Sequence, residues 1–289
     1  MALGRECLPA GLCGESVFGR CRVRRYRLEH LGHDVHLYDS HCHLDILQDR
    51  YGTSMSDLSL PQQFRGCVAN FCHPWQYRLA PGILRDPRTW GSVGLHPKFA
   101  DSVCSSLLGE IEDLLNNPKV VAVGETGIDY FRESNPSSTC QKYVFAAQCR
   151  LALQRQLPIV VHCRGAERDT LALMTEYLPS THPIHLHCFT GGWVSAQQFL
   201  EHFTNLYIGV AGKLTPPVRE LVEHIPLNRL LLETDTPFLM PRSAPTDCTF
   251  THPGMVLHQA KTIADIKQVS VGIVCSRTSD NVEMLYNLG

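Results

Sequence analysis

The chain has 289 residues, of which 44% are hydrophobic and 19% are charged, as in ordinary globular proteins. This composition excludes disordered, collagen-like and fibrous proteins, and the length allows one large α/β barrel. Lysine and arginine number 26 against 28 aspartates and glutamates, so the formal charge is −2. No overall positive field is available to hold a polyanion, and any nucleic-acid binding must depend on local features.

The 13 cysteines are scattered along the chain and form no paired motif of the zinc-ribbon kind. An odd number at wide spacing predicts free thiols in a reducing compartment. We find neither an apolar run of about 18 residues nor a secretory signal, so we expect a soluble protein that does not enter a membrane.

Residues 1–34 differ from the rest of the chain and form an N-terminal extension to a single domain over 35–289. The extension carries five arginines within eight positions: Arg20, Arg22, Arg24, Arg25 and Arg27. Such a cluster is an arm for nucleic acid, a weak nuclear-import patch, or a solvated charge run, and the pattern favours the last. We therefore expect a nuclear or cytoplasmic protein.

From residue 35 onward, short apolar runs alternate with longer amphipathic stretches. The predicted strands are 35–38, 67–71, 89–93, 120–123, 158–161, 184–186, 206–209 and 229–232. The predicted helices are 105–116, 139–156, 167–177, 194–202, 217–224, 254–267 and 278–288. Eight such units predict a TIM-type (β/α)8 barrel. An open doubly wound sheet is the alternative, but no glycine-rich phosphate turn follows the first strand.

Metal-binding or titratable side chains follow six of the eight predicted strands. They are His41 and His43, His96, Glu125, His162, His187 and Asp235. In barrel enzymes the C-terminal strand ends converge on the active site, so these side chains should share one central mouth. His41 and His43 are two residues apart on an extended segment and face the same side.

Four of these histidines with two carboxylates exceed what one tetrahedral ion needs, which indicates a two-metal hydrolytic site. We expect Glu125 to bridge the ions and Asp235 to bind one of them and orient the attacking water. Such a site suits phosphodiester cleavage. Cys42, Cys163 and Cys188 alternate with the histidines and should be buried fillers on the opposite face.

The sequence resembles the TatD-type metal-dependent deoxyribonucleases of the amidohydrolase-like barrel superfamily, in particular the catalytic domain of eukaryotic TatD-domain proteins. The resemblance extends from about residue 37 to the C-terminus. The matching segments are 39–45 (DSHCHLD), 93–97 (VGLHP), 124–130 (GETGIDY), 161–164 (VHCR), 187–191 (HCFTG) and 233–237 (ETDTP).

The resemblance implies a nuclease that holds two divalent ions. His41, His43, Glu125 and Asp235 would bind one ion, and Glu125, His162 and His187 the other. Magnesium or manganese usually supports activity in the family, and zinc also binds. Family members remove nucleotides from DNA ends, typically 3′ to 5′, and some act on RNA or on abasic sites during DNA repair. We expect a nucleic-acid substrate, no obligate protein partner, and a monomer.

Other matched positions have supporting roles. Arg164 would clamp a phosphate or form a surface ion pair. His96 would hydrogen-bond the scissile phosphate or the leaving group, or else make a structural hydrogen bond. Tyr130, Phe131 and Phe189 would stack on bases or pack in the core. Asp129 and Glu233 would orient ligand histidines.

One segment departs from the family pattern, because Thr251-His252-Pro253 stands where the family commonly has Asn-Glu-Pro. Substrate preference is therefore open. Two rival functions are a small-molecule amidohydrolase or lactonase and a non-catalytic nucleic-acid binding module. Many amidohydrolases carry a bridging lysine at the fourth strand, where this chain has Glu125, and the presence of all six proposed ligands argues against the binding module.

Overall fold

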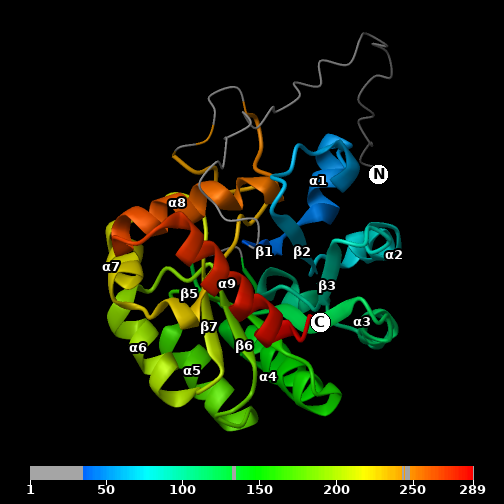
Figure 1. The fold of residues 1–289 in the computed structure, drawn as a ribbon. Coiled ribbons are helices and arrows are strands. Elements are labelled where there is room, and N and C mark those ends of the chain that lie inside the picture. Colours follow the sequence, from blue (N-terminus) through cyan, green and yellow to red (C-terminus); the bar gives the residue numbers. More distant parts are fainter. Residues whose placement is uncertain (1–34, 132–134, 243, 245–247, 289) are drawn as a thin grey trace, which may run out of the picture.

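The structure is a computed structural model and describes residues 35–131, 135–242, 244 and 248–288. The predicted N-terminal extension with its arginine cluster lies outside these residues. Eight strands form one sheet in chain order, and every neighbouring pair is parallel. Helices surround the strands (Figure 1). The predicted TIM-type barrel is thus confirmed.

All eight predicted strands are present, and several extend further towards their C-terminal ends than predicted. The strands are β1 (Leu37–Cys42), β2 (Phe64–Phe71), β3 (Thr89–Val93), β4 (Val120–Asp129), β5 (Ile159–Arg164), β6 (Ile184–His187), β7 (Leu206–Val210) and β8 (Leu230–Leu232). Several of the polar residues that we placed after strands, Glu125 and His162 among them, therefore lie within the ladders. The backbone of His162 is paired with β4 and β6, whereas Glu125 lies within β4 at an irregularity of its pairing with β5.

The seven predicted helices are also confirmed, with shifts of at most two residues at every end except the start of the last one. The helices are α1 (Leu44–Tyr51), α2 (Ala80–Ile83), α3 (Ser105–Leu115), α4 (Ser138–Arg155), α5 (Glu167–Tyr177), α6 (Gly192–His202), α7 (Pro216–His224), α8 (Val256–Lys267) and α9 (Val271–Tyr286). The sequence pattern did not indicate α1 or α2. Helix α9 begins seven residues earlier than predicted because the Ser270 hydroxyl accepts a hydrogen bond from the Ile273 amide and caps it.

Hydrogen bonds between the end of β1 and the segment that follows β8 join the first and last units of the barrel at its C-terminal end. The Asp235 amide donates to the His41 carbonyl at 3.0 Å, and the His43 amide donates to the Thr236 carbonyl at 2.7 Å. The buried Asp39 carboxyl also accepts from the Thr234 amide at 3.0 Å. These hydrogen bonds therefore place the segment that contains His41 and His43 beside the segment that contains Asp235.

Two apolar clusters fill the fold. The larger one lies between the strands and the outer helices and includes Phe71, Phe145 and Phe199. The smaller one fills the N-terminal part of the barrel, where Tyr207 and Leu231 meet side chains of α9. Helix α9 thus covers the N-terminal end of the barrel, which leaves the C-terminal end available for a site.

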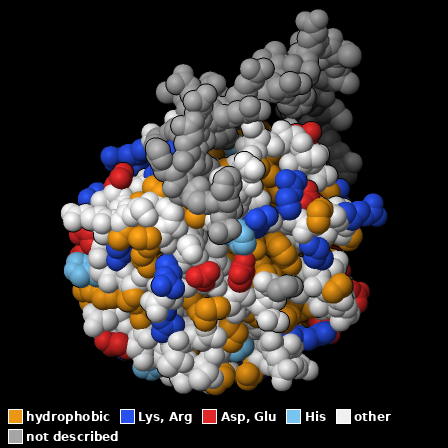
Figure 2. All heavy atoms as spheres, in the orientation of Figure 1, with side chains coloured by type: hydrophobic (Ala, Val, Ile, Leu, Met, Phe, Trp, Pro, Cys, Tyr) orange, Lys and Arg blue, Asp and Glu red, His pale blue; other side chains and the backbone are white. Residues whose placement is uncertain are grey.

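Nine of the ten cysteines in the described residues are free, and Cys42, Cys163 and Cys188 are buried as predicted. Cys248, in the segment after β8, is disulfide-bonded, so the expectation of free thiols throughout is wrong there. No helix in the described part of the chain is long and apolar enough to cross a membrane. Acidic and basic side chains are interspersed on the face shown in Figure 2, in keeping with the near-neutral composition.

Candidate metal centre

His41, His43 and Asp235 meet at the C-terminal end of the barrel. The alternation of β1 places His41 and His43 on one face, with their Nε2 atoms 3.4 Å apart. Asp235 lies three residues beyond β8, and its Oδ1 is 3.7 Å from His41 Nε2 and 3.4 Å from His43 Nε2. Residues almost 200 positions apart therefore share one point of the barrel mouth.

Glu125 of β4 completes this group. Its Oε2 lies 3.5 Å from the Nε2 atoms of both His41 and His43. Donors around a tetrahedral ion with bonds of about 2.1 Å stand roughly 3.4 Å apart, so the observed spacing suits one bound cation. We call His41, His43, Glu125 and Asp235 the first metal cluster.

The other oxygen of Glu125 faces a second set of imidazoles. Oε1 lies 2.6 Å from His162 Nδ1, and 3.6 Å from Nε2 of both His187 and His96. Glu125 therefore stands between the two sets, as a bridging carboxylate must. We call Glu125, His162 and His187, the set that the family resemblance implies, the second metal cluster.

Hydrogen bonds behind the rings determine which nitrogen each histidine can offer to an ion. His43 Nδ1 lies 3.2 Å from the Asn70 carbonyl and His187 Nδ1 lies 3.3 Å from Glu233 Oε2, so each donates there and keeps Nε2 for the metal. His162 Nε2 lies 3.3 Å from Asp129 Oδ2, which leaves Nδ1 as its ligand atom.

His96 is different, because its Nδ1 accepts a hydrogen bond of 3.1 Å from the Lys98 amide. A neutral imidazole in that arrangement carries its proton on Nε2, which points towards Glu125. His96 is therefore placed to donate a hydrogen bond rather than to bind an ion. A hydrogen bond from His96 to the phosphate or the leaving group stays a prediction.

A buried network supports the second cluster from below. Glu233 Oε2 lies 3.3 Å from His187 Nδ1 and 3.0 Å from His185 Nε2. His185 Nδ1 is in turn 2.7 Å from the Tyr286 hydroxyl of α9. The expectation that Asp129 and Glu233 orient ligand rings agrees with this geometry. The sequence analysis missed His185 and Tyr286, although His185 is two residues before His187 on the same strand face.

The carboxylates of the centre are held ionised. Burial by itself would raise the pKa of Glu125, but electrostatic interaction with the His187 and His96 rings and hydrogen bonds from neighbouring rings hold it well below its usual range. Burial likewise opposes ionisation of Asp235, and its hydrogen bond with His43 lowers its pKa. Two anions in a buried pocket form a strong cation site.

The imidazoles divide into two kinds. Burial lowers the pKa of His187 to about 4 and that of His96 well below its usual value, so both are neutral at physiological pH. Burial also opposes protonation of His43 and His162, but hydrogen bonds to carboxylates, Asp235 for His43, raise both pKa values. A metal ion must displace protons from these two rings. Imidazole nitrogens and carboxylate oxygens together suit a divalent metal ion.

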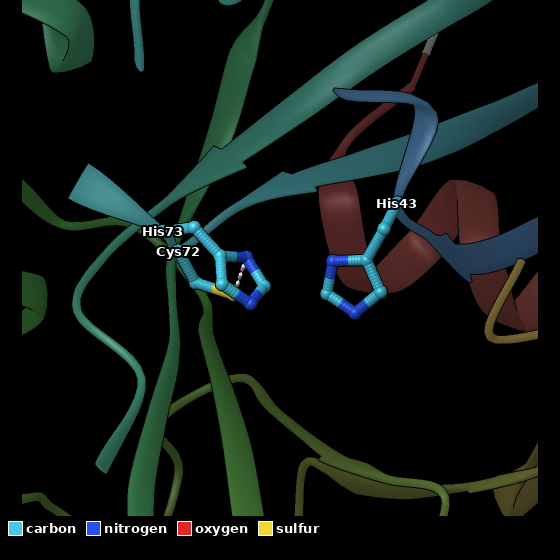
Figure 3. Close-up of side chains that lie close together, drawn as sticks. All are labelled: His43, Cys72 and His73. Atoms are coloured by element: carbon cyan, nitrogen blue, oxygen red, sulfur yellow. Dashed lines mark hydrogen bonds between the residues drawn. The ribbon is translucent and has the colours of Figure 1, made fainter. Parts of the chain in front are cut away.

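The sequence analysis also missed Cys72 and His73, which follow β2. Figure 3 shows the His73 ring beside Cys72 and facing the His43 ring across a gap. Cys72 Sγ lies 3.5 Å from Glu125 Oε2 and 3.6 Å from His73 Nδ1. Burial raises the pKa of the Cys72 thiol to about 12, so it is a neutral donor that steadies the Glu125 carboxylate. The sequence signal for these residues was the pair Cys72-His73 directly after the apolar run of β2.

The centre opens into a pocket of about 210 Å³ at the barrel mouth. Its walls include Arg164, which the sequence predicted as a phosphate clamp, together with Lys98 and Arg50. Arg164 Nη1 donates to the Cys163 carbonyl at 2.9 Å, which fixes the guanidinium at the wall. A small anionic group could thus reach both the metal clusters and a fixed cation.

The three aromatics predicted as stacking candidates do not line this pocket. Phe189 is only 1% exposed, so base stacking on it is excluded and it packs in the core. The Tyr130 hydroxyl donates to Asp169 at 2.7 Å, outside the pocket wall. Phe131 is 84% exposed but likewise lies outside the wall.

The segment that departs from the family pattern is buried beside the mouth. The Thr251 amide donates to the Pro237 carbonyl at 3.2 Å, and the Thr251 hydroxyl donates to the Phe238 carbonyl. His252 Nδ1 accepts from the Gly254 amide at 3.2 Å. These residues hold the chain after β8 in place and do not line the pocket.

Comparisons with known proteins agree with this architecture. The family profile described as TatD related DNase matches residues 38–287. The chain is 35% identical over 265 residues to the human 3′-5′ RNA nuclease TATDN2, covering 86% of this chain and 35% of that protein. It thus spans about a third of the length of that relative.

Similarity extends to bacterial and structural relatives. The chain is 32% identical over 207 residues to the 3′-5′ ssDNA/RNA exonuclease TatD of Erwinia tasmaniensis, which covers 69% of this chain and 78% of that protein. The crystal structure of a TatD family hydrolase from Entamoeba histolytica superposes with a TM-score of 0.76 at 19% identity, covering 87% and 98% of the two chains. That structural likeness supports the barrel fold.

Proposed function

Because the chain belongs to the TatD-related DNase family, we propose that it is a divalent-metal-dependent 3′–5′ exonuclease acting on single-stranded DNA and RNA. The observation that carries the proposal is the position of Glu125. Its two oxygens face separate groups of buried imidazoles at the open end of the barrel. That arrangement suits a two-ion hydrolytic site and a phosphodiester substrate.

The residues of the site have different roles in the proposed hydrolysis. The two metal clusters would hold divalent ions, which would supply activation of a water molecule and neutralisation of negative charge on the phosphate. Asp235, whose low pKa keeps it ionised at the edge of the pocket, orients the attacking water and accepts its proton. His96 donates a hydrogen bond through Nε2 to a phosphate oxygen or to the leaving group.

Arg164 binds the substrate phosphate from the pocket wall. The formal charge of −2 provides no general attraction to nucleic acid, so affinity should depend on such local contacts and fall with salt. A pocket of about 210 Å³ suits a single-stranded end better than a duplex. The named human relative is an RNA nuclease and the bacterial one acts on single-stranded DNA and RNA, which is why both substrates are included.

The test compares end-labelled single-stranded DNA and RNA of matched sequence, with magnesium, manganese, zinc or EDTA, for the wild type and Asp235→Ala. Stepwise shortening from the 3′ end that needs metal and is lost in the variant supports the proposal. The ratio of DNA to RNA rates ranks the substrates. Failure of the metal-loaded wild type to cleave either strand, with turnover of small cyclic amides or esters instead, would favour the amidohydrolase. Binding without turnover would favour a binding module.

We also propose that the protein is a monomer and that it is located in the nucleus or the cytoplasm. The arginine cluster that suggests nuclear import lies outside the described residues. Light scattering of the purified protein and microscopy of the tagged chain with and without residues 1–34 would test the two points. A stable dimer, or a location outside both compartments, would contradict them.

A further inference from the structure

Trp75 is a half-exposed aromatic residue at the edge of the metal pocket. It belongs to the 3₁₀ turn Pro74–Leu79 that follows β2, and it is 55% exposed. Isolated exposed apolar residues are common and need no explanation. Trp75 is distinct because it lines the same pocket as His43, His96 and Glu125.

Neighbouring rings hold the indole in a fixed position. The Phe99 ring meets it edge-on, with centroids 4.8 Å apart and planes at 82°. The His73 ring lies 5.7 Å from the indole and 5.3 Å from Phe99. Trp75 and Phe99 follow different strands, β2 and β3, so two separate elements fix the ring. A ring that is already ordered loses little conformational entropy when a ligand stacks on it.

The indole is also close to the reacting centre. The His73 ring lies 5.7 Å from the His43 ring of the first metal cluster and 5.7 Å from Trp75, so two ring-to-ring steps join them. A nucleotide whose phosphate lies at the metals can therefore place its base near Trp75.

Positive charge accompanies the aromatic surface. Lys98 Nζ lies 4.7 Å from the Phe99 ring centroid and 3.1 Å from His73 Nε2, and Lys98 lines the pocket. The wall also includes Phe238, which is 39% exposed, with the Arg50 guanidinium 5.9 Å from its ring. Aromatic rings interleaved with cations are typical of surfaces that bind single-stranded nucleic acid.

We propose that Trp75 is a base-stacking residue that binds a nucleobase of the single strand next to the scissile phosphate. This inference rests on the proposed nuclease function and adds a specific contact to it. Because every base has an aromatic face, the contact should tolerate sequence but require an unpaired base. It replaces the stacking positions that the sequence suggested at Phe189, Tyr130 and Phe131, none of which lines the pocket.

The first test compares Trp75→Ala with Trp75→Phe on a single-stranded oligonucleotide. Loss of one stacked base should raise KM about 5- to 150-fold, and phenylalanine should restore most of the loss because it keeps a ring. Tyr143→Ala is the matched control, since Tyr143 is 70% exposed on α4 and outside the pocket. Unchanged KM in Trp75→Ala would overturn the proposal.

A second test links Trp75 to one particular base. Substrates that each lack a single base, at successive positions from the 3′ end, are compared for the wild type and Trp75→Ala. At the position that contacts the indole, the effect of the mutation should fall to within about 2-fold, because the partner is already missing. An equal effect of Trp75→Ala on every substrate of the series would show that it acts through the fold instead.

Binding keeps this test independent of turnover. The affinity for a phosphorothioate single strand, measured by fluorescence anisotropy, should drop in Trp75→Ala by the same factor as KM rises. If that drop occurs while the wild type cleaves nothing, stacking is supported and the nuclease function fails. If the wild type cleaves normally and Trp75→Ala binds normally, stacking fails and the function stands. A wild type that neither binds nor cleaves overturns both.

Discussion

Replacing Glu233 by glutamine should weaken metal binding, although Glu233 is not itself one of the proposed metal ligands. Glu233 is fully buried, and its carboxylate accepts from His187 Nδ1 and from the Cys188 amide. Glutamine keeps one oxygen. If that oxygen accepts the hydrogen bond from the Cys188 amide, the NH2 group of the glutamine lies against the N–H of His187. Two hydrogen-bond donors then face each other.

The expected loss can be estimated in two ways. A hydrogen bond to a charged partner contributes about 1.5–3 kcal/mol. Residues that orient metal-ligand histidines typically change metal affinity about 10- to 100-fold, which corresponds to about 1.4–2.8 kcal/mol. Because the two ranges agree, we expect manganese to bind the second cluster of Glu233→Gln 10- to 100-fold more weakly, while the first cluster is less affected.

Isothermal titration with manganese at fixed pH measures both sites. Glu220→Gln is the control, because Glu220 is exposed on α7 and the same amide replacement there removes no buried contact. The metal-free melting temperature of each variant shows whether the fold is intact. A folded Glu233→Gln protein with wild-type affinity at both sites would refute the assigned support of His187.

Three further outcomes are expected. Gly209→Ala should also weaken metal binding and lower the melting temperature, because a Cβ on β7 would lie 2.5 Å from His185 Nε2 and closer still to Glu233. Wild-type stability and affinity would contradict that reasoning. Asp235→Asn should lower kcat at least about 100-fold, and activity within 10-fold of wild type in a metal-loaded sample would remove Asp235 as the proton acceptor. Because the pKa of His43 is raised, this ring is protonated below that pKa and must lose its proton to bind metal. Metal affinity should therefore fall as pH decreases, with proton release per metal growing in the same direction. Calorimetry in buffers of different ionisation enthalpy would detect the released protons. Metal affinity that does not depend on pH would contradict the role of His43 as a metal ligand.

The sequence predicted the barrel and its metal-binding residues because both depend on local repetition. Short apolar runs separated by amphipathic stretches specify parallel strands, and such strands bring their C-terminal ends together. The two-residue spacing of His41 and His43 fixes a shared face by strand geometry alone. Glu125, His162, His187 and Asp235 could then be grouped without any knowledge of distances.

Only part of the hydrogen-bonded support of these ligands could be predicted from the sequence. Glu233 was expected to orient a ligand histidine, but its contact with His185 of β6 was not, nor was the contact of His185 with Tyr286 of α9 at a separation of 101 residues. Hydrogen bonds of this kind depend on register and helix placement, which only the closed barrel determines. The same reason explains why Cys72 was missed, since its contact is with Glu125, 53 residues away.

Whether an aromatic side chain is exposed to solvent also depends on the tertiary structure. Phe189 and Trp75 both follow strand ends and look alike in sequence, yet Phe189 is buried under α6 partners such as Phe199 and Trp75 lies half exposed at the pocket. Periodicity and strand order thus predicted the barrel and a set of candidate metal ligands, because both follow from local geometry. Tertiary packing decided which groups orient the ligands and which rings can meet a substrate, because those contacts join segments far apart in the chain.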